Sequence, residues 1–284
     1  MPTCPVCQCK SPAKAWQHGE YTIFECPDCD LQFVHPMRAA PLEYYQAHYQ
    51  DYVPATYEDI HPGFQFTINK IREVTQRYLL PHQRRVIDVG CGPGILLVDL
   101  QKNGFECLGI DFNPVLVRAA NEQFHVPARV ARLEELTTLG LRFDLALLSH
   151  VLEHVEDPVG LLKNIREILN PGGVLVIETP NRNWYSPSHS LEKGTLWWFY
   201  YPPHHLTFVS IAALDRMLRL TGYSVLECIS RPFDDMNRVQ TFLGKRLKLP
   251  EGRLFSLGVR TIRWIGRLAG FQGGTLHAVA RRME

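Results

Sequence analysis

The chain has 284 residues, 45% hydrophobic and 21% charged, which is the composition of a globular protein with a sizeable core. A formal net charge of +1 supplies no global field that would favour nucleic acid or an anionic membrane. The start of the chain lacks the apolar segment of a signal peptide, and no apolar run reaches the roughly 20 residues that span a bilayer, so we expect a cytoplasmic protein.

Four cysteines near the start form a C-x2-C-x18-C-x2-C pattern of Cys4, Cys7, Cys26 and Cys29. Two such pairs can close a tetrahedral thiolate site around zinc, and residues 21–26 between them are predicted to form a strand. We therefore expect a zinc ribbon over residues 1–35. Four thiolates fill the coordination shell, so this zinc would be structural, and so small a module should unfold without it. An iron site of the same geometry and a set of free thiols are the alternatives.

The rest of the chain divides into two further parts. Residues 36–83 read as a helical linker or lid, with an amphipathic pattern over 66–80. From residue 84 onward, short β-branched runs alternate with helical patterns. Strands are expected at 84–90, 106–113, 128–133, 143–151, 174–180, 224–230 and 275–282, and helices at 94–104, 114–125, 158–173 and 211–223. This alternation predicts an α/β fold with a doubly wound parallel sheet.

A glycine-rich turn follows the first of these strands, in the sequence Asp88-Val-Gly90-Cys-Gly92-Pro-Gly94. Glycine can adopt positive φ and lets a ligand approach the main chain. Asp88 can accept hydrogen bonds from a ligand ammonium, and Asp111, at the end of the next strand, from both hydroxyls of a ribose. The alternatives are a tight turn without a ligand and a nicotinamide-dinucleotide site. The second would need G-x-G-x-x-G, and Asp88 would repel its pyrophosphate.

Four motifs carry a family resemblance: VIDVGCGPG (86–94), GIDFNP (109–114), FDLALLSHVLEHVEDP (143–158) and LNPGGVLVIETPN (169–181). In this order and spacing, they resemble the class I S-adenosylmethionine-dependent methyltransferases over about residues 84–230. The resemblance implies a Rossmann-like, seven-stranded sheet with an antiparallel last strand. We expect a methyltransferase domain over 84–284, with a helical insertion at 233–272 between the last two predicted strands. It also implies that the methionine part of S-adenosylmethionine lies over Gly90, Gly92 and Gly94 and that Asp111 holds the ribose.

One position departs from the family pattern. Arg132 stands where an acidic residue often reads the adenine amino group, so the adenine contact is expected from the backbone near Leu133 or from Glu134. The full set of expected cofactor-binding residues is Asp88, Gly90, Cys91, Gly92, Gly94, Asp111, Phe112, Leu133, Glu134 and Ser149.

Histidines supply the candidate catalytic groups, which are His150, His204 and His205. Histidine titrates near neutral pH, which suits a base for O- or C-methylation. Related ubiquinone-pathway O-methyltransferases and small-RNA 2′-O-methyltransferases bind a divalent metal through Glu-x-x-Glu-His. Here His150 replaces the first glutamate of that run, so a catalytic metal on His150, Glu153 and His154 stays open beside a purely structural role for the last two. Ser210 is expected to cap the helix that follows.

The ribbon and the segment after it resemble a subgroup of bacterial sugar, surface-polysaccharide and secondary-metabolite methyltransferases, including nucleotide-sugar C-methyltransferases. We therefore expect a small-molecule acceptor, most plausibly a sugar or a glycan- or lipid-linked precursor. An RNA methyltransferase is an alternative that the few basic residues of the ribbon disfavour, and a non-catalytic binding module is another. Residues 253–268 are a candidate for peripheral membrane contact, for a cover over the acceptor mouth or for a dimer contact.

Overall fold

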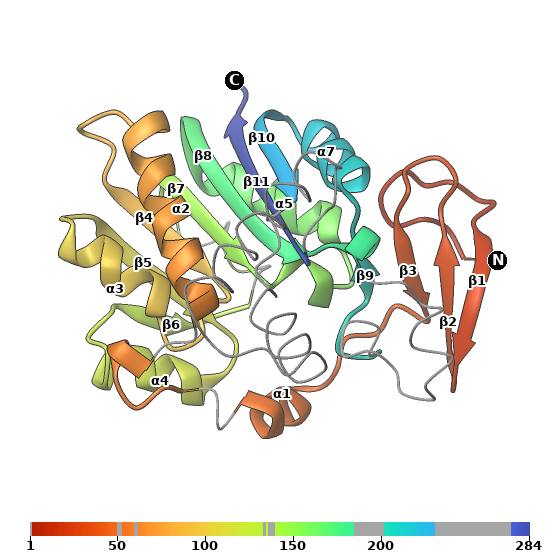
Figure 1. Ribbon diagram of the computed structural model, residues 1–284, viewed down its shortest axis with the longest axis horizontal. Helices are drawn as coiled ribbons and strands as arrows, with labels where there is room; N and C mark the ends of the chain where they lie inside the picture. Colours follow the sequence, from red (N-terminus) through yellow and green to blue (C-terminus); the bar gives the residue numbers. More distant parts are fainter. Residues whose placement is uncertain are drawn as a thin grey trace, which may run out of the picture.

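The computed structural model describes residues 2–49, 53–59, 62–132, 135, 140–184, 202–230 and 274–284 (Figure 1). Two predictions lie outside these residues. They concern the adenine contact at Leu133 and Glu134 and the insertion at 233–272, which includes residues 253–268.

The main sheet has seven strands: β4 (Arg85–Val89), β5 (Glu106–Asp111), β6 (Ala128–Val130), β7 (Phe143–Ser149), β8 (Leu169–Pro180), β10 (Tyr223–Ser230) and β11 (Thr275–Arg282). Their order across the sheet is β10-β11-β8-β7-β4-β5-β6. The five strands from β8 to β6 are parallel, whereas β11 runs antiparallel to both of its neighbours. This confirms the predicted seven-stranded, Rossmann-like α/β fold with an antiparallel last strand.

Helices cover both faces of this sheet: α2 (Pro62–Tyr78), α3 (Ile95–Lys102), α4 (Pro114–Glu122), α5 (Pro158–Ile168) and α7 (Ile211–Leu220). Successive residues of a strand point to opposite faces, so each strand contributes to two cores. Val86 joins the core with α2 and α3, and Ile87 joins the core with α5 and α7. In such folds, ligands bind beyond the carboxyl ends of the parallel strands.

Helix boundaries follow local side-chain chemistry. Asn113, Asp157 and Ser210 each accept a hydrogen bond from a first-turn backbone N–H, so the predicted cap at Ser210 is present. The segment predicted as a helix closed by Asn-Pro-Gly-Gly at 170–173 forms α5, which stops at Ile168, and β8 begins at Leu169 instead of the expected residue 174. Pro171 explains this early end, since proline has no N–H and disfavours a helical residue before it.

A second, four-stranded antiparallel sheet occupies the amino-terminal part. It contains β1 (Ala13–His18), β2 (Tyr21–Glu25), β3 (Gln32–His35) and β9 (Thr207–Phe208), in that order. Because β9 comes from far along the chain, it joins the cysteine-bearing part to the segment just after His204 and His205 (Figure 1). The sequence analysis did not predict this pairing.

Between the two sheets the chain forms α1 (Leu42–Tyr49) and a short 3-10 turn at Tyr57–Asp59, and then enters α2. Two further 3-10 turns follow β7 and β8, at Leu152–His154 and Arg182–Trp184. None of the helices in the described ranges has the length and apolarity needed to cross a bilayer.

Candidate active site

The glycine-rich turn links the end of β4 to the start of α3. Gly90, Gly92 and Gly94 have φ of +73°, +53° and +81°. A Cβ at Gly90 would lie 2.4 Å from Cγ2 of Val151, so this position needs glycine for space as well as conformation. A Cβ at Gly92 would meet no described atom within 4 Å. The main chain at Gly92 is therefore open to a ligand on that side.

Asp111 ends β5 and is fixed against this turn. Its Oδ2 accepts a hydrogen bond from the Gly92 N–H at 2.9 Å, and its Oδ1 accepts one from the Asn113 N–H at 2.8 Å. Burial raises the pKa of this carboxyl above its usual value. Each carboxylate oxygen has a second lone pair, so both can still accept a ligand hydroxyl.

Asp88 lies one residue before the end of β4 and is 2% exposed. Burial, and then the charge of Asp111, raise its pKa well above the usual range. Its Oδ1 has no hydrogen-bond partner among the described residues. A buried carboxylate oxygen without a partner is costly, and a cationic donor from a ligand would remove that cost.

Three other predicted cofactor residues lie around the same strand ends. Cys91 is buried against Gly109, where a Cβ would come within 2.6 Å of its Sγ. Phe112 is 40% exposed, and its ring meets Tyr45 of α1 edge to face with centroids 5.0 Å apart. Ser149 ends β7 and donates a hydrogen bond to Oε2 of Glu178 at 3.3 Å.

His150 follows β7 in a left-handed conformation, with φ of +54°, and its side chain is 48% exposed. Its Nδ1 lies 3.2 Å from Oε1 of Glu153, which is 1% exposed. Burial alone would raise the pKa of Glu153, but the hydrogen bond from His150 and the charge of His154 lower it to about 2. An ionised Glu153 accepts the Nδ1 proton of His150, which leaves Nε2 as the basic nitrogen.

His204 and His205 pack against His154, the neighbour of Glu153 in the chain. The ring centroids are 4.6 Å apart for His154 and His204 and 4.8 Å for His154 and His205. Burial lowers the pKa of His154 to about 4, despite the opposing charge of Glu153. One ligand nitrogen from each of the three rings lies within 4.8 Å of the others, so this trio is a second candidate metal set beside His150, Glu153 and His154.

Tyr45 is a site residue that the sequence analysis missed. Its ring centroid lies 5.0 Å from that of Phe112, 5.9 Å from that of His204 and 6.1 Å from that of His154. It therefore connects the cofactor side of the site with the histidines. The abundance of tyrosine in residues 36–80 is the one sequence signal for it.

The four predicted zinc ligands come together in the amino-terminal part. Sγ of Cys4 lies 3.5 Å from that of Cys29, Sγ of Cys7 lies 3.3 Å from that of Cys26, and all four lie within 4.8 Å of one another. Thiolates about 2.3 Å from a tetrahedral zinc lie about 3.8 Å apart, which fits this set. The contact with the Cys29 sulfur lowers the pKa of Cys4, which favours the thiolate form that binds metal.

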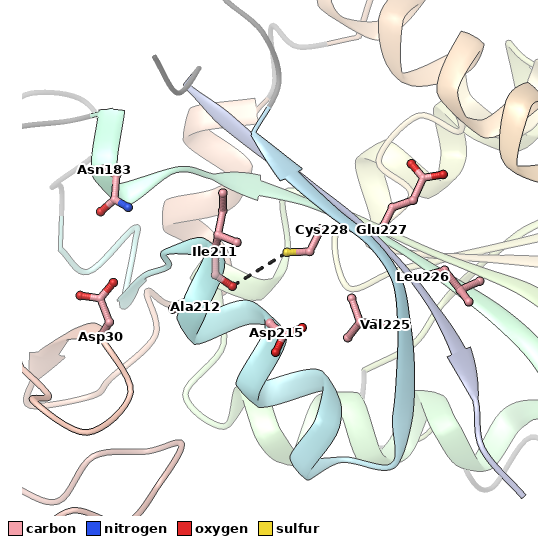
Figure 2. A pocket seen from close by; sticks show the side chains of 9 residues that line it. All are labelled: Asp30, Asn183, Ile211, Ala212, Asp215, Val225, Leu226, Glu227 and Cys228. Carbon is pink, nitrogen blue, oxygen red and sulfur yellow. Dashed lines mark hydrogen bonds between the residues drawn. The ribbon is translucent and has the colours of Figure 1, made fainter. Parts of the chain in front are cut away.

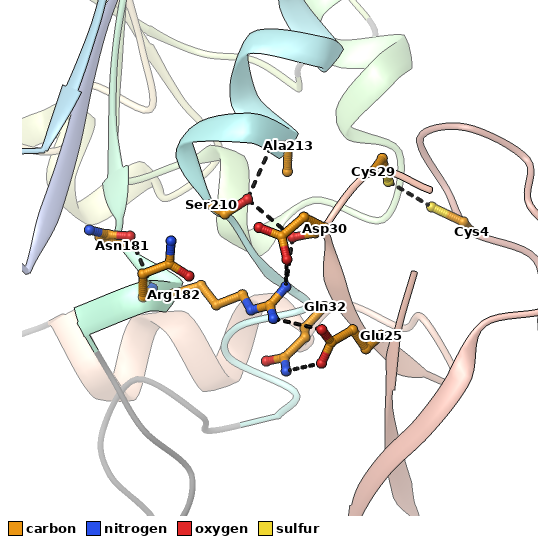
Figure 3. Close-up of polar contacts among 10 residues, drawn as sticks. Cys4, Glu25, Cys29, Asp30, Gln32, Asn181, Arg182, Ser210 and Ala213 are labelled. Carbon is orange, nitrogen blue, oxygen red and sulfur yellow. Dashed lines mark hydrogen bonds and ion pairs between the residues drawn. The ribbon is translucent and has the colours of Figure 1, made fainter. Parts of the chain in front are cut away.

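Arg182, which follows β8, connects the cysteine-bearing part of the chain to the main sheet. Its guanidinium donates to the backbone and side-chain oxygens of Asp30 at 2.7 and 2.6 Å and to Oε1 of Glu25 at 2.8 Å (Figure 3). The Ser210 hydroxyl, which caps α7, donates to the same Asp30 carbonyl at 3.1 Å. The Cys26–Asp30 loop, which carries two of the four clustered cysteines, thus contacts two elements of the main domain.

A hollow of about 620 Å³ lies between α7, the outer edge of β10 and the Cys26–Asp30 loop. Figure 2 shows its lining, where Cys228 donates a long hydrogen bond of 3.9 Å to the Ile211 carbonyl. None of the predicted cofactor or catalytic residues lines it. The candidate active site is therefore the region around Asp88, Asp111 and the histidines, and not this hollow.

Comparison with known families identifies residues 64–228, more than half of the chain, as a methyltransferase domain. Ubiquinone biosynthesis O-methyltransferase from Cereibacter sphaeroides is 37% identical over 110 residues, covering 37% of this chain and 44% of the relative. The Coxiella burnetii protein of the same name is 33% identical over 123 residues, covering 41% and 53%. The chain thus spans about half the length of the curated relatives it matches.

Solved structures show the same fold. A SAM-dependent methyltransferase from Archaeoglobus fulgidus superposes with a TM-score of 0.52 at 20% identity, over 77% of this chain and 94% of that one. Magnesium protoporphyrin IX methyltransferase from Synechocystis PCC 6803, with bound SAH, gives 0.50 at 16% identity, over 79% and 85%. The [4+2]-cyclase SpnF gives 0.51 at 18% identity, over 77% and 82%, so the fold alone does not fix the reaction. The family match and the seven-stranded sheet together show that the chain belongs to the class I S-adenosylmethionine-dependent methyltransferases.

Proposed function

We propose that the chain transfers a methyl group from S-adenosylmethionine to a small-molecule acceptor. The observation that carries this proposal is the pair of buried carboxylates at the ends of adjacent strands, on either side of a main chain that is open at Gly92. Asp88 would take the cofactor ammonium and Asp111 the ribose hydroxyls. Both assignments fit the residues present, because Asp88 has an oxygen without a described partner and Asp111 is already held in place.

The other cofactor contacts follow from this placement. Main-chain groups from Gly90 to Gly94, including Cys91, would lie along the methionine part, and the exposed ring of Phe112 would face the adenine. Ser149 borders the methionine end, and Leu133 or Glu134 would complete the adenine contact. When bound, the cofactor supplies a methyl group on a sulfonium, which is electrophilic without further activation.

His150 is the group that we assign to the acceptor. Its exposed ring stands at the end of β7, and buried Glu153 holds its Nδ1 proton, so Nε2 can accept a proton from the acceptor nucleophile. Holding that nucleophile in line with the methyl group supplies much of the remaining acceleration. His204 and His205, beside His154 and Tyr45, would form the wall of the acceptor cavity.

The acceptor class is inferred from two directions. The relatives are named as ubiquinone biosynthesis O-methyltransferases, which favours a small hydroxylated molecule. The resemblance of the ribbon and the segment after it to sugar-modifying enzymes favours a sugar or a glycan- or lipid-linked precursor. Cytoplasmic residence and a lack of nucleic-acid partners remain predictions from composition.

We also propose that Cys4, Cys7, Cys26 and Cys29 hold a structural zinc ion. The sulfur separations support it, and the two metal loops repeat one backbone pattern. The N–H of Cys4 donates to the Cys9 carbonyl and that of Cys26 to the Leu31 carbonyl. The domain division that we propose is a zinc ribbon at 1–35, a helical linker or lid at 36–83 and the methyltransferase domain at 84–284, with its insertion at 233–272.

Calorimetric titration of the purified protein with S-adenosylmethionine and S-adenosylhomocysteine (SAH) tests the cofactor assignment, with NAD as the control ligand. We expect 1:1 binding of the first two and no heat with NAD. Heat from NAD alone, or from none of the three, rejects the assignment. Phenolic ubiquinone-type precursors, nucleotide sugars and total RNA can then be screened for cofactor-dependent gain of one methyl group by mass spectrometry.

A further inference from the structure

The face of the main sheet toward α2 carries a row of polar side chains at its carboxyl end. Val86, Leu147 and Val176 pack with Ile68 and Ile71 of α2 on this face. Because side chains alternate along a strand, the residues two positions later lie on the same face. These are Asp88 on β4, Ser149 on β7 and Glu178 on β8.

Glu178 is the member of this row that the sequence analysis did not assign. It is 2% exposed, and its Oε2 accepts hydrogen bonds from the Thr67 hydroxyl at 2.7 Å and the Ser149 hydroxyl at 3.3 Å. Its Oε1 is buried and accepts no hydrogen bond from the part of the chain that the structure describes. The contact with Ser149 shows that the carboxylate leans toward β7, which lies between β8 and β4.

The basic side chains of α2 do not neutralise this carboxylate. Lys70 pairs with Glu73 and Glu227, and Arg72 pairs with Asp99. Arg77 also pairs with Glu227. Within the described ranges, Glu178 takes part in none of the ion pairs of these side chains. A cation for this carboxylate would therefore come from a ligand.

The sheet register places Glu178 within reach of the same ligand atom as Asp88. Asp88 pairs with Leu147 on β7, and Ser149, two residues further along β7, pairs with Glu178. Two strand spacings across and two residues along separate the Cα atoms of Asp88 and Glu178 by about 12 Å. The two side chains can span most of that distance, which leaves room for one ammonium with a contact of about 2.8 Å to each carboxylate.

We propose that Glu178 is a second carboxylate for the α-ammonium of the cofactor, acting together with Asp88, and that Thr67 and Ser149 hold it in position. This inference rests on the proposed function, because it requires S-adenosylmethionine over the glycine turn. The inference adds a cofactor contact on β8, two strands away from β4, which leads into the glycine-rich turn. It also gives α2 a part in the cofactor site, through the hydroxyl of Thr67.

The test compares two ligands that differ only in the ammonium. These are SAH and its desamino analogue, 5′-S-(3-carboxypropyl)-5′-thioadenosine, titrated calorimetrically against the full chain and two variants. E178Q should weaken SAH binding by on the order of 10- to 100-fold and change binding of the desamino analogue less than about twofold. E227Q is the matched control, because Glu227 is also a strand glutamate that is bonded to α2, and the dissociation constants of this variant for both ligands should stay unchanged.

If E178Q weakens the binding of both ligands equally, or of neither, the proposal is wrong. Glu178 would then stabilise the sheet or pair with His277 instead. If E178Q does not fold, E178D keeps the charge but withdraws the carboxylate by one methylene. It should show the same selective loss to a smaller extent, and an unselective loss overturns the proposal. If the unaltered chain binds neither ligand, the proposed function fails first, and the inference fails with it.

Discussion

Asp88 combines burial with an oxygen that accepts no hydrogen bond from the described residues, so in the free protein it opposes folding whenever it is ionised. Its folded pKa lies above the unfolded value of about 3.9. Between the unfolded and the folded pKa of Asp88, the native state therefore binds more protons than the unfolded state. The free energy of unfolding consequently falls as the pH rises through this range. A residue that costs stability in this way is typical of a binding site.

Asp88→Asn should consequently stabilise the free protein at neutral pH, because it removes the desolvation cost of the charge and keeps the shape. Thermal unfolding measures this, since about 1 kcal/mol corresponds to roughly 2–4 °C in a protein of this size. The same variant should lose most of the rise in Tm that SAH gives the wild type. A lower Tm without ligand would show that the carboxylate stabilises the fold instead.

The affinity for SAH should rise with pH through the raised pKa of Asp88. A protonated Asp88 offers no charge to the ammonium, so binding must release that proton, and a higher pH makes the release easier. Titration in buffers of different ionisation enthalpy counts the protons released. No release and a flat pH profile would contradict the contact between Asp88 and the ammonium.

His150→Ala should lower kcat about 100-fold or more once an acceptor is known, because a positioned base commonly contributes that much. SAH affinity should remain as in the wild type, since the proposed cofactor contacts do not include this ring. His82→Ala, at an exposed position after α2, is the control. If kcat is unchanged in His150→Ala, another group must act as the base.

Among single residues, the places of Asp88, the glycines and Asp111 were predictable, because each lies at the end of a strand or just after it in an unbroken local pattern. The contacts of Tyr45 with His204 and of Glu178 with Thr67 were not. Both join residues more than 100 positions apart, and one sequence without homologues gives no signal for such a pairing.

At the scale of elements, the turn between β4 and α3 offers a matched pair of glycines. Both Gly90 and Gly92 have positive φ, so an alanine at either costs about 1–2 kcal/mol of backbone strain. Only at Gly90 does the new Cβ also collide with Val151. Gly90→Ala should therefore unfold at lower denaturant than Gly92→Ala.

Gly92→Ala, in contrast, should remain folded and lose SAH binding, because its methyl group enters the open space beside the main chain. Chemical denaturation and titration with SAH, carried out on both variants, test whether Gly90→Ala mainly loses stability and Gly92→Ala mainly loses binding. If Gly92→Ala binds SAH as tightly as the wild type, the ligand does not lie against that peptide.

The strand pair β3–β9 connects the two cysteine-bearing loops, where we propose the zinc site, with the histidines. The N–H of Val34 donates to the Leu206 carbonyl at 2.9 Å, and the N–H of Leu206 donates to the Glu153 carbonyl at 2.7 Å. Loss of the metal should release β3 and expose β9. We expect faster hydrogen exchange at residues 206–208 after chelation, with little change in β4 and β7.

Cys29→Ser should reproduce the effect of chelation, and Cys9→Ser, which changes a thiol outside the four-sulfur set, should not. Metal analysis should find one zinc ion per chain in the wild type and the Cys9 variant. If exchange at 206–208 is unaffected by removal of the metal, the two parts are not coupled through β9.

For the molecule as a whole, the alternation of strands and helices predicted the layers of the main domain. It missed the place of the amino-terminal sheet, because β9 is only two residues long and too short for any periodic pattern. One hydrophobic core also extends from the amino-terminal sheet into the main domain. Cys4, Cys26, Leu31 and Phe33 belong to the same buried cluster as Ile87 and Leu148. Metal binding and the stability of the main domain should therefore be linked.

A crystal structure of the complex with SAH tests the central claim of this account most directly. The account predicts that the ribose hydroxyls lie on Asp111, that the thioether chain runs along Gly90 to Gly94, and that the ammonium lies beside Asp88. A complex with SAH bound elsewhere, or with side chains filling the space above Gly92, would contradict it.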